Sequence, residues 1–167
     1  MADTGFKSPS SSTTGGWTSL SNCYSSNNVY ATTFSTTFVS GDVSVFAFGV
    51  PSDATIDGIE ITAEFSLNAS VNTATVQLSI SGNGGLAYSA TKSNTVTGST
   101  DTVKTYGGPT DLWGEASFSE YGTQDGNFYV KVEGKTSNAS FSCRLDHIQV
   151  KIYYSENSSG FFLLMGA

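Results

Sequence analysis

Histidine is the side chain that most often serves as a general base near neutral pH, and this 167-residue chain has one, His147. Any histidine-based triad or metal site must therefore include His147. The residue follows Asp146 in a strand-like segment, but a catalytic base also needs a nucleophile within reach and a group that orients it. No pattern in the sequence selects either partner. We therefore predict a structural His147, no catalytic residue and no enzyme activity.

Paired carboxylates are the other common catalytic device on a β-sandwich, as in glycoside hydrolysis. Glu60 and Glu64 lie on one face of a predicted strand, about 13 Å apart by the rise of an extended chain. That distance is too long for the carboxylate pair of either a retaining or an inverting glycosidase. They are better interpreted as a solvated strand face.

Calcium sites need several oxygen ligands at fixed spacing. Asp53, Asp57, Asp101 and Asp111 are instead scattered singly among predicted turns. The sequence therefore predicts no metal site and no cofactor, with a structural cation held by turns as a minor alternative.

Exposed aromatic side chains provide the stacking surfaces of many sugar-binding proteins. Trp17 and Trp113 are the candidates for glycan stacking. Trp113 lies in the turn-rich segment 107–114, however, where an aromatic ring more often plugs the end of a sandwich. Glycan stacking is thus an alternative, and packing into the core is the leading interpretation.

Cys23 and Cys143 are the two cysteines, and their contexts show no metal-ligand spacing. They could form one disulfide, but reduced and packed thiols are the expectation.

Alternating apolar and polar residues predict most of the strands. Residues 59–67 alternate over nine consecutive positions, which predicts a half-buried strand with Ile59, Ile61, Phe65 and Leu67 facing the core. The preceding segment, 43–50, is expected to be its antiparallel neighbour. Residues 76–80 and 86–90 predict a hairpin with a glycine-rich tip at 82–85.

The last long strand changes its alternation near Asp146 and His147. Phe141, Cys143 and Leu145 occupy odd positions, whereas the later apolar residues occupy even ones. Because a shift of one residue moves every side chain to the opposite face, this change predicts a β-bulge.

These patterns, with many aromatic, Ser, Thr and Gly residues and no helix-period stripe, predict an all-β fold. We expect an antiparallel two-sheet β-sandwich, jelly-roll or immunoglobulin-like, with extended N- and C-terminal arms. The expected parts are a flexible N-terminal arm over 1–16, the sandwich over 17–154, and a C-terminal linker with an apolar tail over 155–167.

Charge argues against nucleic acid as a partner. The chain carries 14 acidic and 7 basic residues, a net charge of −7, with no cluster of Lys or Arg to neutralise phosphates. Segment 1–10 has neither the basic nor the apolar region of a secretory signal. The longest apolar run, 161–165, is far shorter than the roughly 20 residues that span a bilayer, so no membrane partner is expected.

Several segments of the chain carry a resemblance to a known class of proteins: 5–9 with Trp17, 30–33, 51–60, 110–114 and 145–154. In these segments the chain resembles small β-sandwich virion structural proteins of tailed bacteriophages. The resemblance implies a virion protein, assembled in the host cytoplasm, that decorates the capsid or belongs to the tail. Other virion subunits would be its partners, and a homo-oligomer is expected.

The leading functional expectation is a capsid decoration protein that binds the outside of a phage head. Its expected assembly contact is the apolar tail: Phe161, Phe162, Leu163, Leu164 and Met165. The alternatives are a tail-fibre or tail-tip module that binds host glycan, or a secreted, extracellular carbohydrate-binding or adhesion module.

Deleting residues 161–167 tests the expected assembly contact. Each apolar side chain in the tail contributes about 1.5–3 kcal/mol when fully buried, so docking on a neighbour would anchor a subunit. We expect the truncated chain to keep its melting temperature but to incorporate poorly into its assembly. Unfolding on truncation would instead assign the tail to its own core, and normal incorporation would remove it as a contact.

Overall fold

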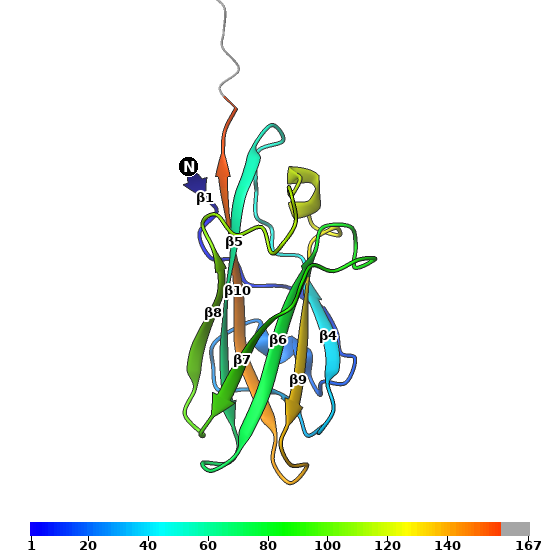
Figure 1. The fold of residues 1–167 in the computed structure, drawn as a ribbon, viewed down its shortest axis with the longest axis vertical. Coiled ribbons are helices and arrows are strands. Elements are labelled where there is room, and N and C mark those ends of the chain that lie inside the picture. Colours follow the sequence, from blue (N-terminus) through cyan, green and yellow to red (C-terminus); the bar gives the residue numbers. More distant parts are fainter. Residues whose placement is uncertain (158–167) are drawn as a thin grey trace, which may run out of the picture.

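The computed structural model describes residues 1–157 as two antiparallel sheets that enclose one core (Figure 1). The predicted all-β, two-sheet sandwich is therefore confirmed. The first sheet contains β1 (Ala2–Asp3), β3 (Ala31–Thr33), β5 (Thr55–Leu67), β8 (Thr102–Gly108) and β10 (Cys143–Ser155). The second contains β2 (Ser11–Thr13), β4 (Val39–Ser44), β6 (Thr73–Ser81), β7 (Lys92–Thr97) and β9 (Tyr129–Thr136).

Two short 3-10 helices, η1 (Leu20–Cys23) and η2 (Glu120–Thr123), interrupt the loops. Within residues 1–157, no helix has the length and apolar character needed to cross a bilayer. The predicted tail contact at Phe161–Met165 lies outside the described residues.

The long strands β5 and β10 form the centre of the first sheet. β5 pairs with β10 on one side and with β8 on the other, and β1 and β3 pair with the two ends of the far edge of β10. In the second sheet the order is β2, β4, β9, β6 and β7.

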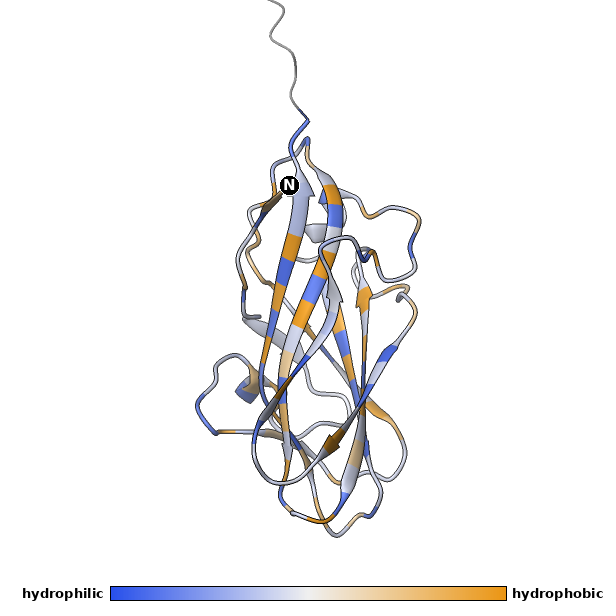
Figure 2. Cartoon of the chain, turned by 60° about the vertical axis from the view of Figure 1, so that its left-hand side comes forward, coloured by the Kyte–Doolittle hydropathy of each residue, from blue (hydrophilic) through white to orange (hydrophobic). Residues whose placement is uncertain are grey.

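The alternation predicted for 59–67 is confirmed. Ile59, Ile61 and Phe65 are fully buried, whereas Glu60 and Thr62 remain partly exposed. Figure 2 shows this alternation as hydrophobic and hydrophilic bands along the long strands. The core faces of β5 and β10 pack against those of β6 and β9, so one apolar layer holds the two sheets together.

The β-bulge predicted near Asp146 and His147 is also confirmed. Leu145 lies opposite Phe65 and His147 lies opposite Glu64, so Asp146 is the extra residue on β10. Ile148 and Ile152 on the far side of the bulge are fully buried. The extra residue keeps the apolar side chains of both halves of β10 in the core.

The expectation of a flexible arm over residues 1–16 is wrong. β1 pairs with β10 at the edge of the first sheet, and β2 pairs with β4 at the edge of the second. Lys7 and Val150 exchange backbone hydrogen bonds between these two contacts. Edge pairing uses backbone N–H and C=O groups, so a segment poor in apolar side chains can still join a sheet.

The expected pairing of 43–50 with 59–67 is wrong as well. β4 ends at Ser44 and pairs with β9 in the second sheet, while β5 belongs to the first. Val45 and Ala47 take positive φ angles of 61° and 51°, which ends the extended strand. The following apolar residues close one end of the core, where Phe46 and Phe48 stack with ring centroids 5.2 Å apart.

The predicted hairpin after β6 is present with a different second strand. β6 pairs with β7, with Leu78 opposite Lys92, and residues 86–90 belong to the connecting loop. Leu86 is 88% exposed, so the apolar residues of that segment do not mark a strand. The loop instead supplies side chains to a surface cleft.

Substitutions at two neighbouring positions of β5 test which of its side chains face the core and which face solvent. Ile61→Ala removes a fully buried side chain and should cost about 2–5 kcal/mol of unfolding free energy, because a cavity remains. Thr62→Ala, on the wet face, should change stability by no more than about 0.5 kcal/mol. Denaturant unfolding measures both values, and equal losses would contradict the assignment.

Candidate functional site

Trp113 closes one end of the sandwich and is only 1% exposed. Its indole N–H donates to the Ile59 carbonyl at 2.9 Å. A side chain at Gly107 would collide with that carbonyl and with the indole nitrogen, so the close approach requires glycine there. The Asp111 carboxylate accepts a hydrogen bond from the Trp113 backbone N–H at 2.7 Å and forms an ion pair with the Lys92 ammonium at 2.8 Å.

Trp17 is 2% exposed and lies against the inner side of β9. Its indole N–H donates to the Val132 carbonyl at 3.1 Å, and its ring occupies the space that a side chain at Gly134 would fill. The alternative of glycan stacking by Trp17 and Trp113 therefore fails, because neither ring presents a face to solvent. Both act as core residues with a satisfied N–H group.

His147 shares a hydrogen bond with Ser8, with Nε2 and Oγ 2.8 Å apart. Burial lowers the pKa of His147 below its usual value, although the Glu64 and Asp146 carboxylates oppose this shift. A Ser–His pair can activate a nucleophile when a third group orients the histidine. Within residues 1–157, no hydrogen bond to Nδ1 supplies that group. The contact instead fastens the N-terminal segment to β10.

A surface cleft of about 220 Å³ lies at one end of the second sheet. It opens between the loop that connects β6 to β7 and the segment that leads into η2. Residues from both segments line it: Ile80, Ser81, Gly82, Asn83, Ala87, Tyr88, Ser89, Glu115, Ser117, Phe118, Ser119 and Gly122.

The floor of the cleft depends on two glycines around an aromatic ring. Phe118 packs edge-on against Phe128, with ring centroids 6.0 Å apart. A side chain at Gly82 would come within 2.6 Å of the Phe118 ring, and one at Gly122 within 3.0 Å. Glycine at both positions lets the two loops close around Phe118 while leaving space above it.

Tyr88 forms the aromatic wall of the cleft. Its hydroxyl donates to the Asp42 carboxylate at 2.6 Å, and the Lys131 ammonium lies 3.6 Å from its ring centroid. Burial and the Asp42 carboxylate raise the pKa of Tyr88, so its hydroxyl stays protonated at neutral pH. Contacts from two strands therefore hold the ring in place.

Polar side chains on the rim keep free hydrogen-bonding capacity. Glu115 and Ser117 are exposed, and neither side chain makes a hydrogen bond to another described residue. Asn83 uses its carbonyl oxygen to accept from the Ala87 N–H at 3.0 Å, which leaves its NH₂ group for another partner. The rim thus offers an acceptor, a hydroxyl and a donor.

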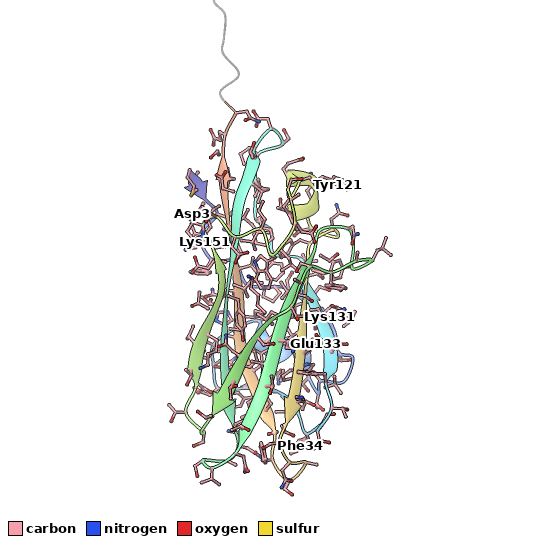
Figure 3. The ribbon with its side chains drawn as sticks, in the orientation of Figure 1. Asp3, Phe34, Tyr121, Lys131, Glu133 and Lys151 are labelled. Carbon is pink, nitrogen blue, oxygen red and sulfur yellow. The ribbon has the colours of Figure 1, made fainter. Side chains whose placement is uncertain are left out.

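Tyr121 extends this surface beyond the cleft. It lies on η2, next to the cleft residue Gly122, and is 61% exposed. Figure 3 shows Tyr121 in the upper part of the view, with Lys131 below it. This tyrosine, rather than either tryptophan, is the aromatic side chain open to solvent near the candidate site.

The arrangement is suited to binding a small polar molecule. Rigid aromatic surface and a few convergent polar groups are the usual features of such sites. The cleft is lined by one carboxylate, Glu115, whereas hydrolysis of a glycosidic bond uses two. The two halves of the site, 80–89 and 115–122, share no pattern in the sequence that would predict their meeting.

Comparison with known proteins gave structural matches only. No protein-family model and no curated protein matches the chain. TmCBM61 in complex with β-1,4-galactotriose matches 78% of this chain and 74% of its own, with a TM-score of 0.42 and 10% identity. The carbohydrate-binding module CBM36 in complex with calcium and xylotriose matches 93% and 100%, with a TM-score of 0.39 and 16% identity.

A third match is a family 16 carbohydrate-binding module, which covers 81% of this chain and 92% of its own at a TM-score of 0.41 and 10% identity. These low scores and identities do not assign the chain to a family.

The two cysteines give a test of the packing around the described core. Both thiols are free and buried, and burial raises the pKa of each to about 12. Because the thiolate is the reactive form, we expect no labelling of Cys23 or Cys143 by a thiol reagent in the folded protein. Both should react in denaturant, and rapid labelling of the native state would contradict their burial.

Proposed function

We propose that this chain is a non-catalytic glycan-binding domain, and that the cleft beside η2 receives one sugar ring. The observation that carries the proposal is the combination in one cleft of fixed aromatic surface, Tyr88 and Phe118, with the unpaired polar groups of Asn83, Glu115 and Ser117. Sugars have apolar faces and hydroxyl edges, and this pairing of surfaces complements both.

The size of the cleft fits a small ligand. Its volume of about 220 Å³ lies below the roughly 300–1,000 Å³ of pockets that hold drug-sized molecules. A single sugar ring matches this space, and the rest of an oligosaccharide would continue across the surface. Exposed Tyr121 then provides a stacking face for a neighbouring sugar.

Charge favours a neutral glycan. The rim carries the Glu115 carboxylate, and the chain as a whole has a net charge of −7. A uronic or sialic acid would bring a second negative charge beside Glu115. The ammonium group of nearby Lys131 already makes a cation–π contact with the ring of Tyr88.

The virion role is a separate proposal that rests on the sequence resemblance. A glycan-binding domain would suit the tail-associated alternative better than the capsid one. The expected assembly contact at 161–165 lies outside the described residues and does not enter the glycan proposal.

Affinity electrophoresis against neutral polysaccharides, followed by calorimetry with the matching oligosaccharides, tests glycan binding. Ala87→Trp should fill the cleft and abolish binding. Glu115→Ala removes a charged hydrogen-bond acceptor worth about 1.5–3 kcal/mol, so Kd should rise about tenfold or more.

Ala139→Trp is the matched control, because Ala139 is also exposed but lies in the β9–β10 turn, outside the cleft. It should bind as the parent does. Equal binding by the Ala87 and Ala139 variants would place any glycan site elsewhere.

A further inference from the structure

Three carboxylates from distant parts of the chain meet on the outer side of the first sheet. Glu64 lies on β5, Asp101 immediately precedes β8, and Asp146 is the extra residue of the bulge in β10. One oxygen from each lies within 4.8 Å of the others. This cluster is separate from the proposed glycan cleft, with which it shares no residue.

A loop from the N-terminal third of the chain covers the cluster and contacts all three acids. The Ser26 hydroxyl donates to Glu64 at 2.9 Å, and the Tyr30 hydroxyl donates to Asp101 at 3.0 Å. The backbone N–H groups of residues 27 and 28 donate to the two oxygens of Asp146 at 3.4 and 3.2 Å. The carboxylates are therefore held together under loop 25–30.

No cationic side chain of residues 1–157 forms an ion pair with these acids. The ion pairs in that range are Lys92–Asp111 and Lys151–Glu60, and both lie elsewhere. The guanidinium of Arg144 lies 5.0 Å from the ring centroid of Tyr30, the residue that donates to Asp101. Asp146 is only 1% exposed, so water screens its charge poorly. Clustered carboxylates without a counter-charge repel one another strongly in such surroundings.

Two buried oxygen atoms, one within the cluster and one next to it on β5, have no hydrogen-bond partner among residues 1–157. One is Oδ1 of Asp101, and the other is Oγ of Ser66, a residue with 0% exposure. Ser66 lies two residues from Glu64 on the same face of β5. Continuing the β5–β8 register one step beyond the Phe65–Thr102 pair sets Ser66 opposite Asp101. Native proteins rarely leave buried polar atoms unsatisfied, so a ligand at this position would explain both.

We propose that Glu64, Asp101 and Asp146 bind one Ca²⁺ ion, with the Ser66 hydroxyl beside it. Oxygen ligands, mostly carboxylates, are what Ca²⁺ requires, and its tolerance of irregular geometry suits ligands from a strand, a loop and a bulge. The ion neutralises the repulsion and satisfies the orphaned oxygen of Asp101. It also links loop 25–30 and the β7–β8 connection to the centre of the first sheet.

Thermal unfolding and calorimetry of the full chain, first stripped with EDTA and then titrated with CaCl₂, test the site. Ca²⁺ binding to the native state should raise the melting temperature, and the rise should grow with the logarithm of free Ca²⁺. MgCl₂ should shift it less, because Mg²⁺ demands a stricter octahedron. These measurements use no glycan, so their outcome is independent of the proposed function.

Asp101→Asn is the main variant, with Asp146→Asn as the second and exposed Asp53→Asn as the matched control. Loss of one charged ligand should weaken Ca²⁺ binding by about tenfold or more, while the control keeps the parent affinity. In EDTA, Asp101→Asn should melt no lower than the parent, because it relieves repulsion. If the parent shows no Ca²⁺ response, or Asp101→Asn is destabilised equally with and without Ca²⁺, the site is overturned.

Discussion

The antiparallel pairing of β5 with β10 fixes the position of most other parts of the molecule. Both strands are thirteen residues long, and their register sets Ile61 opposite Val150 in the core and Glu64 opposite His147 on the outer face. β8 then adds to β5, while the N-terminal segments add to β10. A slip of one residue would turn every core side chain to solvent, so the apolar layer enforces this register.

The sequence predicted the parts of the fold that depend on the alternation of apolar and polar residues along one strand. Alternation alone places Ile59, Ile61 and Phe65 in the core, and the change of phase near Asp146 requires the bulge. Pairing partners follow from chain topology instead, which explains why β4 joins β9 rather than β5. The pairing of β1 with β10 and of β2 with β4 could not be predicted, because hydrogen bonds at a sheet edge need no side-chain pattern.

The candidate sites were harder to predict, because each is assembled from segments far apart in the chain. The cleft combines 80–89 with 115–122, and the acidic cluster combines positions 64, 101 and 146. The type of an aromatic residue also does not predict whether its ring is exposed. Trp17 and Trp113 each use their single N–H group on a strand carbonyl inside the core, whereas Tyr121 on a short helix is the exposed ring. Burial depends on tertiary contacts that composition does not show.

The position of β1 has a mechanical consequence. Ala2 lies opposite Tyr154, so the first strand and the last leave the sandwich side by side at the same end (Figure 1). A force that separates these two points loads the antiparallel hydrogen bonds one after another, as in opening a zip, rather than all at once. Under tension the N-terminal segment would peel from β10 first, with Lys7 and Ser8 released in turn from Val150 and His147. Pulling these two points apart is therefore expected to detach the N-terminal segment before it breaks the much longer pairing of β5 with β10.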